Sequence, residues 1–319
     1  MDDTTKVERK WRLAAELADE GGRSRDLEGA DLSLTQLQGV DLHGANLQAA
    51  DLTGADLRGA DLRQADLRYA ALAGTTLDES TLIDDKWRLV SEVASNPEGG
   101  RDLREANLSE ARLAGVRFGA ADLTGATLEG ADLRGADLRE ALLTRAKLKG
   151  AKLDDNTQLG DRWRAVWRLA TEGGVAEDLS EEYLAGANLS GARLAGANLV
   201  RATLTDSDLS WSDLSGACLE GADLVRTDLR GATLQTATLC EAALQEADLR
   251  GADLYQADLR RARLEGSRLD DTTLIDGKWR RAWQIVNEGG AHADLQEADL
   301  SEADLRGADL SSANLRGGN

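Results

Sequence analysis

The chain has 319 residues, a formal net charge of −20 and an isoelectric point near 4.6. This acidity argues against nonspecific nucleic-acid binding and against docking on anionic membranes, but it permits basic protein partners. Only 3% of the residues are aromatic and one is proline, so a conventional mixed core is not expected, and no apolar run approaches the roughly 18 residues that span a bilayer.

The N-terminal region, residues 1–22, is expected to form a capping helix at the start of the chain. It contains the segment Lys10-Trp11-Arg12 and ends in a Gly-Gly pair, and glycine is a common helix stop. The region lacks the layout of a secretory signal peptide, so a cytoplasmic location is expected.

From residue 23 a five-residue unit with a central leucine recurs, as in Ala-Asp-Leu-Arg-Gly at 55–59. In an extended segment alternate side chains point the same way, so the centre and the small residue two positions before it are expected to face inward. The last residue of a unit is often Gly or Ala, which suits a corner. A strict short period predicts a solenoid, because each unit can bury its apolar side only against its neighbours.

Three further tryptophan segments divide the repeats into four blocks. Their centres run from Leu27 to Leu82, from Leu103 to position 158 if Gln158 counts as a degraded centre, from Leu179 to Leu274, and onward from Leu295. The predicted organisation is a capping helix at 1–22, repeats at 23–83, a helix at 84–100, repeats at 101–159, a helix at 160–176, repeats at 177–275, a helix at 276–292 and repeats at 293–319.

The tryptophan segments switch to a helical period. In the third, Trp163, Val166, Trp167 and Ala170 lie at i, i+3, i+4 and i+7, which predicts one apolar helix face. Acidic residues precede each internal tryptophan and favour a helix N-terminus. We expect four helices of about ten to twelve residues. The internal ones either pack along one side of a continuing rod, the favoured placement, or cap coil ends and separate short rods.

Block lengths indicate the number of units in a coil. The first three blocks hold twelve, twelve and twenty units, all multiples of four, which favours four units per coil with positions 20 apart stacked. The unit Ala-(Asp/Asn)-Leu-X-X resembles the repeat of the pentapeptide-repeat proteins over most of the chain. This resemblance implies a mainly β fold, a right-handed quadrilateral β-helix (a β-solenoid), here with four short α-helices.

The sequence contains no catalytic or cofactor pattern. It lacks a Gly-x-Ser-x-Gly elbow, a phosphate-binding Gly-Lys-Ser/Thr loop and a His-Glu-x-x-His motif, so no enzyme activity, cofactor or metal is expected. Cys218 and Cys240 are too few for a disulfide framework, and both are expected to be reduced surface residues. His43 and His292 have no zinc-ligand spacing.

Acidic residues in the third block form the first candidate binding feature. With positions 20 apart stacked, Asp208, Asp228 and Asp248 should form one column, and Asp213 and Asp253 should lie on the next face. A ladder of carboxylates could imitate the phosphates of a duplex, and members of the resembled family protect DNA gyrase by mimicking DNA. The alternative is a solvated face that keeps a leucine-rich rod soluble.

Exposed aromatics are the second candidate feature. Trp211 lies at a corner, Tyr255 should point outward, and Trp167 and Trp283 are the candidate partly exposed anchors on the helices.

The sequence therefore predicts a non-enzymatic protein-interaction scaffold; the alternative is a DNA mimic that protects or inhibits a type II topoisomerase such as DNA gyrase. The expected partner is a protein, for example a DNA-binding enzyme, with no direct contact to nucleic acid or membrane. The last coil should expose Leu310 and Leu315, so a homodimer or an end-to-end assembly through this coil is expected.

Overall fold

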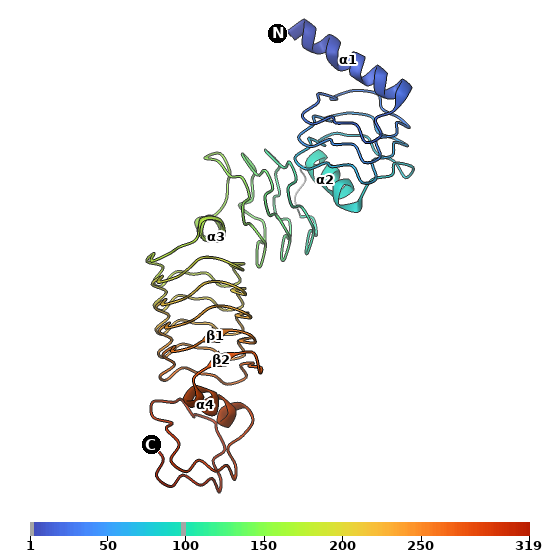
Figure 1. Ribbon diagram of the computed structural model, residues 1–319. Helices are drawn as coiled ribbons and strands as arrows, with labels where there is room; N and C mark the ends of the chain where they lie inside the picture. Colours follow the sequence, from blue (N-terminus) through green and yellow to red (C-terminus); the bar gives the residue numbers. More distant parts are fainter. Residues whose placement is uncertain (1–2, 97–99) are drawn as a thin grey trace. The chain divides into compact units, whose positions relative to one another are not determined.

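The computed structural model describes residues 3–96 and 100–319, with side chains from residue 8 onward. The chain divides into two compact units, Met1–Gly160 and Asp161–Asn319, each coloured along the sequence in Figure 1. The first unit contains helices α1 (Asp3–Glu20) and α2 (Asp85–Ser95). The second contains α3 (Asp161–Glu172), α4 (Gly277–Asn287) and the parallel strands β1 (Asp253–Leu254) and β2 (Leu274–Ile275).

The helices follow the predicted segments with two differences. The first, α1, has 18 residues and is longer than expected. Asp84 and Asp276 occupy the N-cap positions of α2 and α4, but neither side chain makes a cap hydrogen bond. Their carboxylates therefore contribute through the helix dipole alone.

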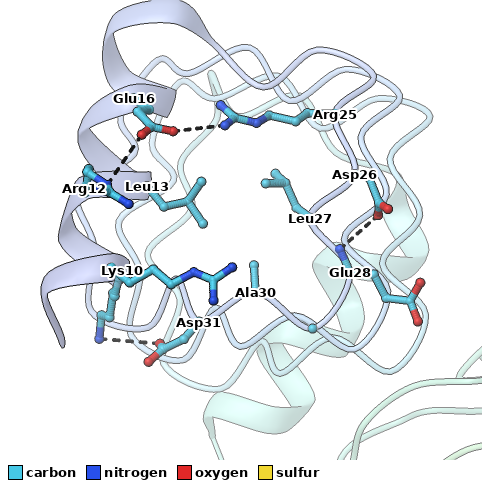
Figure 2. Close-up of a pocket in the computed structure, with 12 residues that line it drawn as sticks. Lys10, Arg12, Leu13, Glu16, Arg25, Asp26, Leu27, Glu28, Ala30 and Asp31 are labelled. Atoms are coloured by element: carbon cyan, nitrogen blue, oxygen red, sulfur yellow. Dashed lines mark hydrogen bonds and ion pairs between the residues drawn. The ribbon is translucent and has the colours of Figure 1, made fainter. Parts of the chain in front are cut away.

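The repeats wind into a β-solenoid with coils 20 residues apart. Parallel bridges join Asn188 to Asp208, Asp208 to Asp228 and Asp228 to Asp248. Since a unit has five residues, a coil holds four units, as predicted. Figure 2 looks into the coils at the N-terminal end of the first block. The right-handed winding that the family resemblance implies stays a prediction.

Leucine and alanine columns form the core. The central residues Leu209 and Leu229 are fully buried, and so is Ala187 at the small position of its unit. Ser212 replaces that alanine in its unit, and its Oγ donates to the carbonyl of Leu209 at 2.7 Å. The inward alternation predicted from the sequence is confirmed.

The last residue of a unit forms the corner. Its φ is positive in glycines such as Gly59 (70°) and also in Tyr69 (60°) and Trp211 (59°). The turn is closed by a hydrogen bond from the next residue to the preceding central carbonyl, as from Ala60 N–H to the Leu57 oxygen at 3.0 Å. Corners this close together leave so few extended residues per side that the coils are joined mostly by single bridges.

The final unit of each long block differs from the prediction. Leu82, Gln158 and Leu274 are exposed, and Leu159 is buried instead of Gln158. The bridge from Asp61 to Leu82 spans one residue more than a regular coil. One inserted residue therefore moves these three predicted centres outward and places the next aliphatic residue inside.

A buried threonine fixes this insertion. In the segment 270–275, Thr273 Oγ1 donates to the Leu249 carbonyl at 3.0 Å and accepts the Asp270 N–H at 3.1 Å. Asp270 Oδ1 in turn accepts the N–H of Gly251 at 3.2 Å. The same pattern occurs in segments 78–83 and 154–159, and we call the three segments terminators.

The Gly-Gly pairs connect helix to coil. Gly173, at φ 86°, follows α3, and its N–H donates to the Leu169 carbonyl at 3.0 Å. Gly174 then occupies an inward position, where a Cβ would lie 2.7 Å from Leu169 Cδ2 and 3.3 Å from Leu194 Cδ2. A leucine of the helix thus takes the place that a central leucine has elsewhere.

The internal helices α2 and α4 lie at joints between successive blocks. Ser95 of α2 accepts the N–H of Gly74 in the preceding block at 2.8 Å. Lys86 of the same helix donates to Ser109 in the following block at 3.0 Å. Helix α4 makes the equivalent bonds through Asn287 and Lys278. Among the described residues no β-bridge crosses α2 or α4, but one corner hydrogen bond crosses each, from Tyr69 N–H to the Glu110 carbonyl and from Arg261 N–H to the Glu302 carbonyl. The favoured expectation of a continuing rod with helices along its side therefore stays a prediction.

Candidate interaction surface

The aspartates before the central leucines have a structural role. Asp228 Oδ1 accepts the N–H of Arg230 at 3.1 Å, a bond that recurs through the repeats and stabilises the turn. The Arg230 side chain folds back, and its Nη2 lies 2.6 Å from Asp228 Oδ2. An Asp-Leu-Arg run therefore neutralises its own carboxylate.

The column of Asp208, Asp228 and Asp248 is stacked as predicted, but its charge is largely balanced. Asp248 pairs with Arg250 at 2.6 Å, and Arg230 Nε lies 4.0 Å from the same carboxylate. The hydrogen bond from Arg250 is the main cause that holds the pKa of Asp248 below its usual range. The side chains of Asp228 and Asp248 are little exposed, so these two members of the column are ion-paired. Asp208 instead accepts hydrogen bonds from the uncharged Asn188 and Ser210.

In the neighbouring column, Asp213 and Asp253 form no ion pair within the described residues, although Arg193 lies one coil before Asp213. Bridges join Asp213 to Thr233 and Thr233 to Asp253, which confirms that the two aspartates share a face. Asp213 Oδ1 accepts the Ser215 hydroxyl at 2.7 Å. Asp253 accepts the side-chain amide of Gln235 at 2.6 Å and the N–H of Tyr255 at 3.0 Å. These partners are all uncharged.

Two exposed aromatics flank this column. Trp211 is 74% exposed, and its ring lies against the next corner, where a Cβ on Gly231 would be 2.5 Å from the ring carbons. Tyr255 is also exposed and directly follows β1. Trp211 lies at a corner as expected, and its role as a binding anchor stays a prediction. We call Trp211, Asp213, Gln235, Asp253 and Tyr255 the aromatic-acidic face.

The two helix tryptophans predicted as anchors, Trp167 and Trp283, lie elsewhere in the second unit. Trp283 is half-buried against the core of the third block, and its indole N–H donates to the Ser267 carbonyl at 3.0 Å. Trp167 is half-buried on α3. The structure does not bring either residue to the aromatic-acidic face. Sequence analysis missed Gln235, although its position 20 residues before Tyr255 places it next to that side chain in the stack.

The cysteines and the clusters of acidic side chains form no further candidate site in the described residues. Cys218 and Cys240 are free but half-buried rather than at the surface, and burial raises the pKa of the Cys240 thiol. Within residues 3–96 and 100–319, no group of three His, Cys, Asp or Glu side chains could hold a metal ion. In the same part of the chain, no helix combines the length and apolarity needed to cross a membrane.

Similar solved structures include pentapeptide repeat proteins and a fluoroquinolone resistance protein. One from the cyanobacterium Cyanothece 51142 is 36% identical, with a TM-score of 0.24; the alignment covers 28% of this chain and 65% of that chain. HetL of Nostoc sp. strain PCC 7120, involved in heterocyst differentiation regulation, is 27% identical over 82% of this chain and 98% of its own, with a TM-score of 0.24. QnrB1, a plasmid-mediated fluoroquinolone resistance protein, is 17% identical over 77% of this chain and 92% of its own, with a TM-score of 0.19.

A search of curated proteins gave no match. The family is shown by a sequence model of the repeat. The model for pentapeptide repeats matches in eight copies, at residues 23–54, 45–82, 102–139, 121–155, 183–221, 207–242, 241–276 and 291–319. These matches cover well over half of the chain and coincide with the stacked coils described above, so the chain belongs to the pentapeptide-repeat family.

Proposed function

We propose that the protein is a non-enzymatic, cytoplasmic scaffold that binds a basic segment of a protein partner through the aromatic-acidic face. The observation that carries this proposal is Trp211, a large aromatic that is 74% exposed on a fixed corner. Tryptophan is among the residues that dominate binding energy at interfaces. A rigid position lowers the conformational entropy that an anchor loses on binding.

The charge of the face selects the partner's chemistry. Asp213 and Asp253 have uncharged hydrogen-bond partners, so an approaching lysine or arginine meets carboxylates that form no ion pair in the described part of the chain. An arginine can also stack on an aromatic ring while it pairs with a carboxylate. The formal charge of −20 adds long-range attraction for a basic protein.

A comparative capture experiment tests the scaffold. The full chain is immobilised, exposed to host lysate, and compared with a Trp211→Gly, Tyr255→Ser double variant; glycine suits the positive φ of residue 211. The matched control is Leu142→Ser, which removes an exposed apolar side chain from the first unit. The proposal expects specific basic proteins to be lost with the double variant and retained with the control. Equal capture by all three proteins contradicts it.

The second candidate is a DNA mimic that acts on a type II topoisomerase such as DNA gyrase. The stacked column of Asp208, Asp228 and Asp248 and the net charge favour it, whereas the arginine pairs of that column weaken it. A gyrase supercoiling assay with these three aspartates changed to asparagine tests this function, and mimicry should weaken steeply with added salt. Loss of the effect with Trp211→Gly instead supports the scaffold.

A second copy of the chain is a further proposed partner. Leu315 is exposed and Leu310 is half-buried, and with Leu300 and Leu305 they line a hollow of about 330 Å³ at the last described coil. This apolar surface supports end-to-end assembly or a homodimer through the coil.

A further inference from the structure

The helices share a basic-tryptophan pair that anchors each to the block on its C-terminal side. The basic residue donates to a side chain 23 residues later in three helices: Lys10 to Ser33 at 2.8 Å, Lys86 to Ser109 at 3.0 Å and Lys278 to Ser301 at 2.8 Å. The ammonium groups of Lys86 and Lys278 lie 4.3 and 4.9 Å from the ring centre of the tryptophan next to them. The pair thus orients each helix on its own coil.

At the α2 joint the other side of the helix is covered by the preceding block. Trp87 is only 6% exposed, and Arg88 Nη2 donates to the Thr81 carbonyl of the terminator at 2.7 Å. The corner ladder continues across the joint, because Tyr69 N–H donates to the Glu110 carbonyl at 2.8 Å. One side of the helix therefore holds the next coil, and the other side holds the previous one.

The α4 joint repeats this arrangement. Trp279 is 7% exposed, and Arg280 Nη2 donates to the Thr273 carbonyl at 2.6 Å. Arg261 N–H donates to the Glu302 carbonyl at 2.7 Å, as Tyr69 does at the α2 joint. Two independent copies of the joint therefore bury the same residues with the same bonds.

Helix α1 has the same residues, but within residues 3–96 and 100–319 no coil covers its second side. Trp11 is 46% exposed, although its counterparts are buried. The Arg12 side chain is largely exposed, and its ion pair with Glu16 is long, at 3.9 Å. Leu34 follows Ser33 as Glu110 follows Ser109, has a corner φ of 59° and is exposed.

A cavity continues this uncovered surface. It has a volume of about 580 Å³ and lies between α1 and the first coil. Figure 2 shows Leu13, Leu27 and Ala30 pointing into it. We call Trp11, Arg12, Leu13, Leu27 and Leu34 the seat. Trp11, Arg12 and Leu27 correspond to Trp87, Arg88 and Leu103 at the α2 joint, whereas Leu34 is an apolar residue where the internal joints have Glu110 and Glu302.

We infer that the seat binds the coil at 295–315 of a second copy, which deepens the end-to-end assembly proposed above and rests on it. That coil presents Leu300, Leu305 and Leu315 around its hollow. It therefore offers a leucine-lined coil end, as the first and third blocks do where α2 and α4 cover them. The corner residue Glu302 of that coil stacks next to the corner residue Arg261. At the internal joints, a corner residue of the preceding block donates its N–H to a corner carbonyl of the following block. In the docked pair, the Glu302 N–H of one copy would donate to the Leu34 carbonyl of the other.

The inferred contact is heterologous, because two different surfaces of each copy meet. Such contacts produce open chains of copies unless the geometry closes a ring. A contact that pairs the same surface on both copies would instead stop at a dimer. The size of the assembly therefore separates this inference from a simple homodimer.

Sedimentation velocity on the full chain, up to about 100 µM, provides the first test. The wild type should form species that grow with concentration. Trp11→Ser and, separately, Leu315→Ser should each raise the concentration needed for assembly at least about tenfold, with unchanged helix signal in circular dichroism. Leu142→Ser, which removes an exposed leucine outside both surfaces, should assemble like the wild type.

Mixing the two variants completes the test. Each variant retains one intact surface, so an equimolar mixture of Trp11→Ser and Leu315→Ser should form dimers that neither forms alone. A wild type that stays monomeric overturns both the assembly and the seat. If Trp11→Ser assembles at the same concentrations as the wild type, or if the mixture does not dimerise, the seat is not the binding surface. Assembly through the C-terminal coil would then remain supported.

Discussion

The terminator threonines provide the sharpest stability prediction. Thr273 is buried, its hydroxyl donates to the Leu249 carbonyl, and it accepts the N–H of Asp270. Thr273→Val keeps the branched shape but removes both bonds. The Leu249 carbonyl keeps its bond from the Ala252 N–H at 3.0 Å but loses the hydroxyl, and the Asp270 N–H loses the acceptor that Thr273 provides. A buried polar group left without its partner costs about 1–3 kcal/mol, so the unfolding free energy should fall by about that amount.

Chemical denaturation followed by circular dichroism measures this effect as a shift of the transition midpoint. Thr81→Val and Thr157→Val remove the same bonds and should give similar losses. Thr203→Val, on an outer face and half-buried, is the control and should stay within about 0.5 kcal/mol of the wild type. If Thr273→Val resembles this control, the hydroxyl does not hold the coil end and our account of the terminator fails.

Three further predictions concern acid stability, the core and the helix-coil connection. The pKa of Asp270 is lowered to about 2, below an unfolded value near 3.9. The ionised carboxylate therefore stabilises the folded protein above about pH 4, and this stabilisation is lost as the pH falls toward 2. Asp270→Asn should flatten the acid limb of a curve of unfolding free energy against pH. Leu229→Ala, in the fully buried column, should cost about 2–5 kcal/mol, and Leu315→Ala at its exposed position much less in the same denaturation assay. Gly174→Ala forces a Cβ against the helix leucine and should lower the melting temperature, whereas Gly277→Ala, with open space around it, should leave it unchanged or raise it.

The regular part of the fold could be predicted because five residues determine it. Each unit repeats one inward leucine, one inward small residue and one corner, so the period places Asp208 above Asp228 and Asp213 on the next face. The outward direction of Tyr255 follows from the same alternation, and the exposure of Trp211 follows from its corner position. Every one of these predictions uses contacts between neighbouring units only.

The block ends could not be predicted from the period, because they interrupt it. Gln158 was the visible signal of the inserted residue, since a polar side chain at a predicted centre cannot face a leucine core. The aspartate and threonine shared by the three terminators were a second signal, evident once the block ends are compared.

The joints and the charge balance required side-chain geometry. The placement of α2 between blocks depends on contacts with two coils, which a repeat period does not encode. Counting aspartates could not predict that Asp228 and Asp248 are neutralised. Arg230 and Arg250 were visible in the sequence, but the turn is what folds each of them back onto the preceding aspartate.

Site-specific photo-crosslinking from position 235 tests the proposed function most directly. A photoreactive residue there lies between Trp211 and Tyr255 in the aromatic-acidic face, and the same residue at position 142 in the first unit is the control. Irradiation in the host should link position 235 to discrete basic proteins, and Trp211→Gly should abolish these adducts. Adducts from position 235 that equal those from position 142, or that persist with Trp211→Gly, contradict the account.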